Sequence, residues 1–298
     1  MDERAESIQE SAYGQTTVEE SGMINTPEKR DALQAQGREH LRKRNWQAAS
    51  AIFTHLIEQD DEDSDALIGL ALTLDQSGQY EQMYGLAQRA SQLNPASAEA
   101  LASKARALQK LERVSEAMIA NDQALLLDTN LALAWFNRSG QQLLQQHFPE
   151  ALRYAERAID LDPTDPRCWT NKALALMHME RPFEALEAVK RALQADPDHL
   201  LGLQVQGELL RKYGRLKEIV ETMHHALELA PNDVTSLNLI ASALRTLGEY
   251  AQLYEASSKL VELAPKDLFA WDCQMCALRG MARYKEAMTA IDRVLALE

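Results

Sequence analysis

Two asparagines and two arginines in the middle of the chain are the residues best suited to bind a ligand. Asn137 and Asn171 lie 34 residues apart. Each amide side chain offers both a donor and an acceptor, so such side chains can hold the backbone of an extended peptide. Arg106 and Arg167 could pair with a carboxylate of the same ligand. These residue types predict non-covalent recognition of a peptide.

Groups that could catalyse a reaction or hold a metal are not apparent in the sequence. There is no GxGxxG, P-loop or nucleophile elbow. Cys273 and Cys276 form a CxxC pair, but a closed zinc site needs a second ligand pair, and none has suitable spacing. We therefore predict no catalytic residue, no metal site and no cofactor, and we expect that the chain is not an enzyme.

Composition excludes several classes of partner and location. The net charge of −14 argues against nucleic acid as the main ligand, because binding through phosphates needs clustered Lys and Arg. Neither a signal peptide nor a long apolar stretch occurs, so no membrane contact is expected. Three cysteines are too few for a disulfide framework and fit a reducing compartment. The sequence predicts a cytoplasmic protein.

A period of 34 residues runs through most of the chain. Pro163, Pro197, Pro231 and Pro265 mark it, each in a turn-like setting. Within each period, apolar residues recur at spacings of three, four and seven, which indicates two short helices divided by a break. The large apolar residues at one position are Leu33, Leu67, Leu101, Trp135, Trp169, Leu203, Leu237 and Trp271. The residues four positions later are mostly small: Gly37, Ala71, Ala105, Ser139, Ala173, Gly207, Ala241 and the exception Met275.

This pattern resembles the tetratricopeptide repeat. The stretch from Trp135-Phe136-Asn137 through Ala151 and Ala158 to Pro163 is close to the consensus of that family. The resemblance covers residues 30 to 298 and implies an all-α fold, a right-handed superhelix of about eight antiparallel helical hairpins. The expected units are 30–63, 64–97, 98–131, 132–165, 166–199, 200–233, 234–267 and 268–298.

Two regions depart from the repeat pattern. Residues 1–29 carry seven acidic against two basic side chains and have no apolar period, which predicts a disordered acidic tail. In the fifth unit Pro182-Phe183 replaces the usual aromatic residue of the turn. We expect that the turn is shifted there by one residue.

The resemblance also implies a concave surface, lined by the first helix of each hairpin, where relatives usually bind their ligands. Asn137 and Asn171 fall at its sixth repeat position, a partial match to the longer asparagine ladder of glycosyltransferases that modify Ser and Thr with N-acetylglucosamine. The clamp that grips chaperone tails through their carboxylates matches less well, because only Asn137 and Arg167 agree in kind. The alternative is that both asparagines form hydrogen bonds inside the repeat interface.

These observations predict a protein-binding adaptor or scaffold that holds an extended peptide or partner protein in its concave groove. One alternative is the regulatory or substrate-selecting part of a larger enzyme. Another is assembly through the C-terminal edge, because Met288, Ile291, Val294 and Leu295 are followed by no polar capping helix. The partner itself is not identifiable from the sequence.

Overall fold

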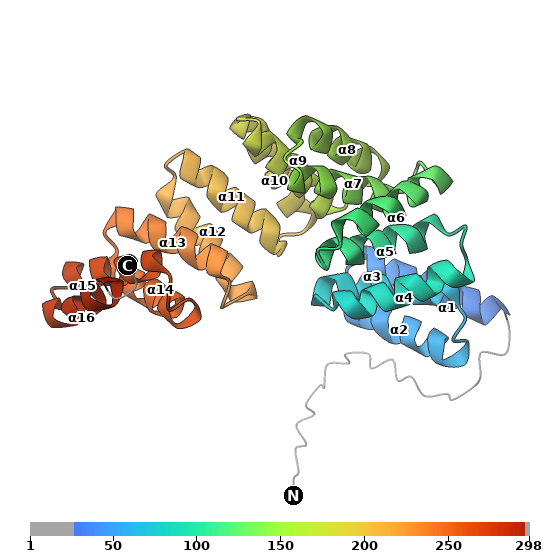
Figure 1. The fold of residues 1–298 in the computed structure, drawn as a ribbon, viewed down its shortest axis with the longest axis horizontal. Helices are drawn as coiled ribbons and strands as arrows, with labels where there is room; N and C mark the ends of the chain where they lie inside the picture. Colours follow the sequence, from blue (N-terminus) through green and yellow to red (C-terminus); the bar gives the residue numbers. More distant parts are fainter. Residues whose placement is uncertain (1–26, 296–298) are drawn as a thin grey trace, which may run out of the picture.

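The computed structural model describes residues 27–295, and every helix or strand assigned in that range is a helix. The helices follow one another as eight antiparallel hairpins that form a curved array (Figure 1). This confirms the expected all-α solenoid. Within the same residues, no helix combines the length and the hydropathy that a bilayer-spanning segment requires.

The first and second helices of the hairpins alternate along the chain. The first helices are α1 (Pro27–Arg42), α3 (Ser64–Ser77), α5 (Ala98–Lys110), α7 (Ala132–Leu144), α9 (Pro166–His178), α11 (Leu200–Lys212), α13 (Val234–Leu247) and α15 (Leu268–Gly280). The second helices are α2 (Trp46–Gln59), α4 (Tyr80–Leu93), α6 (Val114–Leu127), α8 (Phe148–Leu161), α10 (Pro182–Ala195), α12 (Leu216–Leu229), α14 (Tyr250–Leu263) and α16 (Tyr284–Leu295).

The N-terminal boundary of the array differs from the expected one. Helix α1 begins at Pro27 rather than at residue 30. Proline suits the first turn of a helix, because it has no N–H to leave unpaired and its φ angle is already helical. The rest of the expected tail, residues 1–26, lies outside the described residues.

Each hairpin turns through one residue in the left-handed conformation, with φ between 58° and 77°. These residues are Arg44, Gly78, Glu112, Gln146, Glu180, Gly214, Gly248 and Ala282. Their even spacing shows that the turn of the fifth unit is not shifted, so the expectation of a displaced turn there is wrong. Pro182 fits at the start of α10 for the same reason that Pro27 fits at the start of α1.

The loops between hairpins are held by two recurring contacts. A side chain before several first helices caps the helix; for example, Asp233 accepts a hydrogen bond from the backbone N–H of Ser236 at 2.7 Å. In addition, the indole N–H of Trp169 donates to the carbonyl of Pro163 at 2.8 Å, and Trp135 and Trp271 make the equivalent bond. These tryptophans therefore tie each helix to the loop that precedes it.

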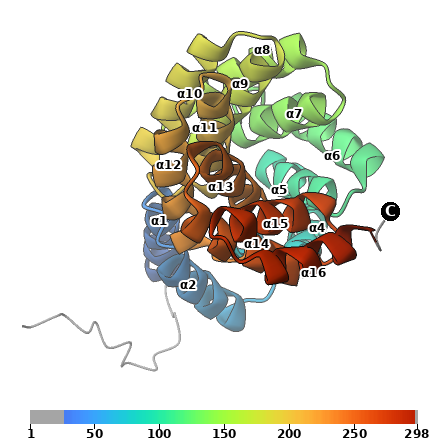
Figure 2. The same ribbon diagram turned by 90° about the vertical axis from the view of Figure 1, so that its left-hand side faces the viewer.

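Helix contacts explain the curvature of the array. Each first helix contacts the first helix of the next hairpin, whereas second helices contact none of the other second helices among the described residues. The small residues Ala71, Ala105, Ala173 and Ala241 are fully buried and permit this close approach. The first helices therefore line the inner, concave side, as the two views of the array indicate (Figures 1 and 2).

Candidate functional site

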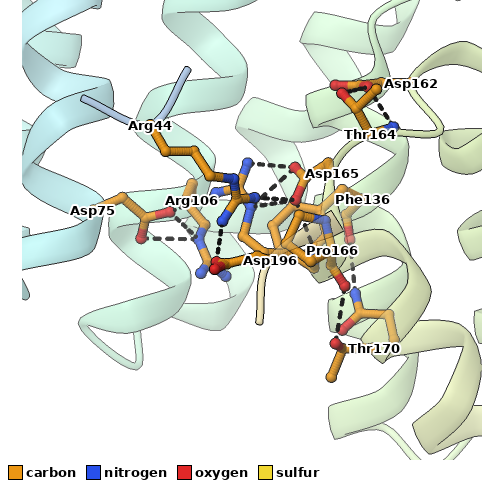
Figure 3. A network of polar contacts seen from close by, with 12 residues as sticks. Arg44, Asp75, Arg106, Phe136, Asp162, Thr164, Asp165, Pro166, Thr170 and Asp196 are labelled. Carbon is orange, nitrogen blue, oxygen red and sulfur yellow. Dashed lines mark hydrogen bonds and ion pairs between the residues drawn. The ribbon is translucent and has the colours of Figure 1, made fainter. Parts of the chain in front are cut away.

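The predicted arginines meet on the concave side around a buried carboxylate. Asp75 lies on α3, and its side chain is 4% exposed. Arg106 of α5 donates from Nε to Asp75 Oδ2 at 3.1 Å, and Arg167 of α9 donates from Nη1 to the same oxygen at 2.9 Å. The network is drawn in Figure 3. The positive charge that the sequence offers to a ligand is therefore neutralised from within the chain.

An aromatic ring and a second carboxylate complete this arrangement. The guanidinium groups of Arg106 and Arg167 lie over the ring of Phe136, at 4.9 and 4.8 Å from its centroid. Arg167 also donates from Nη2 to Asp165 at 2.6 Å. Burial alone would raise the pKa of Asp165, but Arg167 and its hydrogen bonds outweigh burial and lower that pKa below its usual value.

Arg44, in the turn of the first hairpin, reaches across to the same cluster. It pairs with Asp196, which follows α10, and its Nη2 lies 3.8 Å from Oδ1 of Asp165 (Figure 3). A cavity of about 350 Å³ adjoins these ion pairs and is lined by residues from α1, α2, α3, α5, α7 and α9 and from the loop before α9. The first hairpin thus contacts the fifth hairpin and the loop before it across the groove.

The predicted asparagines lie inside the interfaces between successive hairpins. Asn137 is 1% exposed, and its Nδ2 donates to the carbonyl of Ala102 at 2.8 Å and to Asn121 Oδ1 at 3.2 Å. Asn171 is 7% exposed and donates to the carbonyl of Phe136 at 3.4 Å. These bonds agree with the structural alternative for the two residues. Contact between either asparagine and a partner stays a prediction.

Replacing Asn137 by Ala should therefore lower the stability of the array. We expect a loss of about 1–3 kcal/mol in the free energy of unfolding, because the buried Oδ1 of Asn121 would lose its donor and the Ala102 carbonyl would lose its bond from the side chain. Urea unfolding followed by circular dichroism would measure it. Asn130→Ala is the control, since this exposed side chain should change stability by no more than about 0.5 kcal/mol. Unchanged stability of Asn137→Ala would instead favour a ligand-binding role.

A partly buried histidine adjoins the cluster. His199 precedes α11, and its Nε2 is buried with no hydrogen-bond partner among the described residues. Burial lowers its pKa to about 4, with Asp196 and Asp165 acting against the shift and Arg44 and Arg167 adding to it. The imidazole is therefore neutral at neutral pH.

The low pKa of His199 predicts a loss of stability in acid. Between pH 6.5 and about 4 the unfolded chain binds a proton at His199 that the folded chain does not, so unfolding becomes easier as the pH falls through this range. The loss should reach at most about 3 kcal/mol, and it should be absent above pH 7. Urea unfolding at pH 7 and pH 4.5 would measure it, with His199→Asn as the comparison. Equal pH dependence in both proteins would exclude His199 as its source.

A second hollow of about 290 Å³ lies on the concave face between α11 and α13. Its lining consists of Glu208, Arg211, Thr235, Asn238, Leu239 and Ser242. Arg211 pairs with Glu208 at 2.7 Å, while Asn238 Oδ1 has no hydrogen-bond partner within residues 27–295. Polar side chains on two neighbouring first helices suit the backbone of an extended peptide.

The sequence reasoning missed Arg44, Asp75, Asp165 and Asp196. The position of Arg44 carries a partial signal, because it has the register of the turn glycines Gly78, Gly214 and Gly248. No local pattern identifies Asp165 and Asp196 as partners of Arg44, or Asp75 as a partner of Arg167, since each of these pairs joins distant hairpins. Among the described residues, no group of three His, Cys, Asp or Glu side chains is placed to hold a metal ion.

Hairpins in tandem around a concave, polar groove define a class of repeat proteins, the α-solenoids. Two family models match the chain. Residues 42–124 match anaphase-promoting complex (cyclosome) subunit 3, and residues 142–297, more than half of the chain, match the N-terminal TPR repeats region of Psidin. The chain belongs to the tetratricopeptide repeat family.

Solved structures share this fold. A chain in the crystal structure of the APC/C hetero-tetramer Cut9–Hcn1 superposes with a TM-score of 0.75 over 92% of this chain, at 17% identity. This chain covers 54% of that chain, about half of its length. PilF of Pseudomonas aeruginosa superposes with a TM-score of 0.59 at 24% identity, over 72% of this chain and 97% of its own. No curated protein matches in sequence.

Proposed function

We propose that this chain is a protein-binding scaffold that holds an extended segment of a partner in its concave groove, without catalysis of its own. The observation that carries the proposal is the hollow between α11 and α13, where Thr235, Asn238 and Ser242 face the groove beside the Glu208–Arg211 pair. Such side chains can bond to a peptide backbone, and membership of a repeat family built for protein contacts supports this reading.

In this proposal the segment runs along the first helices from this hollow toward the fourth and fifth hairpins. Arg106 and Arg167 would release Asp75 and Asp165 and would bind carboxylates of the segment instead. Asn137 and Asn171 would keep the hairpins in register beneath it. A cytoplasmic location stays a prediction.

Affinity capture from an extract of the source cells tests the groove. The full chain is compared with a groove variant, Asn238→Ala/Ser242→Ala, and with Lys217→Ala/Glu221→Ala on the exposed surface of α12 as the matched control. We expect partners that the groove variant loses and the control retains, with equal thermal stability of the two variants. If both variants capture the same proteins as the native chain, the groove is not the binding surface.

A second candidate function is self-association through the last helix. Tyr284, Met288 and Leu295 of α16 are 66%, 58% and 63% exposed. Apolar side chains in such a group favour contact with another surface. Light scattering over a range of concentrations distinguishes the two candidates, because a mass that stays at 33.4 kDa excludes self-association.

A further inference from the structure

Ion pairs join hairpins that are far apart in the sequence. Arg44 in the first hairpin pairs with Asp196, 152 residues later, and Arg167 in the fifth hairpin pairs with Asp75 of the second, 92 residues earlier. Both pairs cross the concave side of the array (Figure 3). They connect the beginning of the solenoid to its middle.

No packing of helices supports these crossing contacts. Among the described helices, close backbone approach occurs only between neighbours and next-but-one neighbours in the chain. The first hairpin therefore reaches the fifth hairpin and the loop before it through long side chains alone. Ion pairs that are partly exposed are weakened by salt and can open at modest cost, whereas buried apolar contacts cannot.

The ion pairs of Arg44 and Arg167 also border a cavity that a ligand could occupy. The cavity of about 350 Å³ is lined by Arg44, Asp165 and Arg167 together with the apolar side chains of Leu41 and Leu72. It lies in the N-terminal half of the groove, on the side of Arg167 away from the open hollow between α11 and α13. An extended segment could not follow the concave face past these side chains while they remain paired.

We propose that Arg44 is a latch that holds the first hairpin against the fifth hairpin and the loop before it, and keeps the N-terminal half of the groove closed in the free chain. The latch opens when the pairs with Asp165 and Asp196 break, and the first hairpin then moves away from the fifth, while the more buried Arg167–Asp75 pair stays closed. Its regulatory meaning rests on the proposed function of the groove. The latch itself is a property of the free chain.

The turn position of Arg44 supplies a matched pair of variants. Arg44→Gly removes the latch and places glycine where three other hairpins have it, so the turn should fold at least as well. Glu180→Gly makes the same backbone change in the fifth hairpin, where the exposed glutamate side chain forms no hydrogen bond or ion pair within the described part of the chain. Of the two variants, only Arg44→Gly loses the ion pairs with Asp165 and Asp196, whereas the Arg167–Asp75 pair remains in both.

Small-angle X-ray scattering of the full chain measures the closure. We expect a larger radius of gyration and maximum dimension for Arg44→Gly, and native values for Glu180→Gly. In 1 M NaCl, where the Debye length is about 3 Å, the native chain should expand toward the dimensions of Arg44→Gly, which should itself change less.

Phenylglyoxal, which modifies arginine, measures access to the closed groove. Mass spectrometry should show several-fold faster modification of Arg106 and Arg167 in Arg44→Gly than in the native chain or in Glu180→Gly. Expansion or faster modification confined to Arg44→Gly supports the latch. Native dimensions together with native modification rates in Arg44→Gly would overturn it. Because no partner is present, this outcome is independent of the capture experiment.

Discussion

Replacing Phe53 by alanine should lower the free energy of unfolding by about 3–5 kcal/mol. Phe53 lies on α2 with no exposed surface. Its ring fills the space between Gly37 of α1 and Gly69 of α3, where an added Cβ would lie 2.7 and 2.4 Å from ring atoms. Truncation would leave a cavity that both glycines face and neither can fill. Calorimetry and urea unfolding would measure the loss.

Phe183→Ala is the matched control for this substitution. Phe183 has the same side chain but is 78% exposed at the start of α10, where it lies against Tyr213. Its truncation should cost less than about 1 kcal/mol. Similar losses for the two phenylalanines would show that burial between the glycines is not the source of the stability.

Replacing Asp75 by alanine should cost about 3 kcal/mol. The substitution leaves the guanidinium groups of Arg106 and Arg167 without their shared carboxylate, although their side chains are only 13% and 24% exposed. Asp75→Asn keeps the shape and removes the charge, so it should cost nearly as much. Urea unfolding of the three proteins would separate the loss of charge from the loss of volume.

An exposed ion pair gives the comparison for Asp75. Asp122 of α6 pairs with Arg138 of α7, and the carboxylate side chain is 51% exposed. Asp122→Ala should change stability by no more than about 1 kcal/mol, because water can replace the lost partner. If Asp75→Ala costs as little, the cluster around Asp75 is solvated and the crossing pairs contribute nothing to the fold.

The sequence predicts the repeating part of this structure well, because the same physical requirement recurs in every hairpin. The small residues of the 34-residue period are buried at helix contacts, and the large residues such as Trp169 anchor the loops. Eight repetitions make such a pattern detectable without any knowledge of contacts. The expected shift of the turn at Pro182 was wrong because proline, although it differs from the usual aromatic residue, also fits at the start of the second helix.

The groove could not be predicted in the same way. The state of Arg106 and Arg167 depends on Asp75, and the partner Asp196 of Arg44 lies at the end of the fifth hairpin. These contacts follow from the curvature of the whole array, which accumulates from small rotations between hairpins and leaves no local pattern. Likewise, the sequence identified Asn137 and Asn171 as polar groups but could not show that neighbouring hairpins already use their amides.

The limited reach of the helix contacts gives the molecule the mechanics of a spring. Apart from the crossing ion pairs, a pulling force on the two ends is borne by each junction between hairpins in series, since close backbone approach reaches no further than the next-but-one helix in the described chain. Small rotations at every junction then add up to a large change in end-to-end distance. A partner bound along the inner face would fix many junctions at once and stiffen the whole coil.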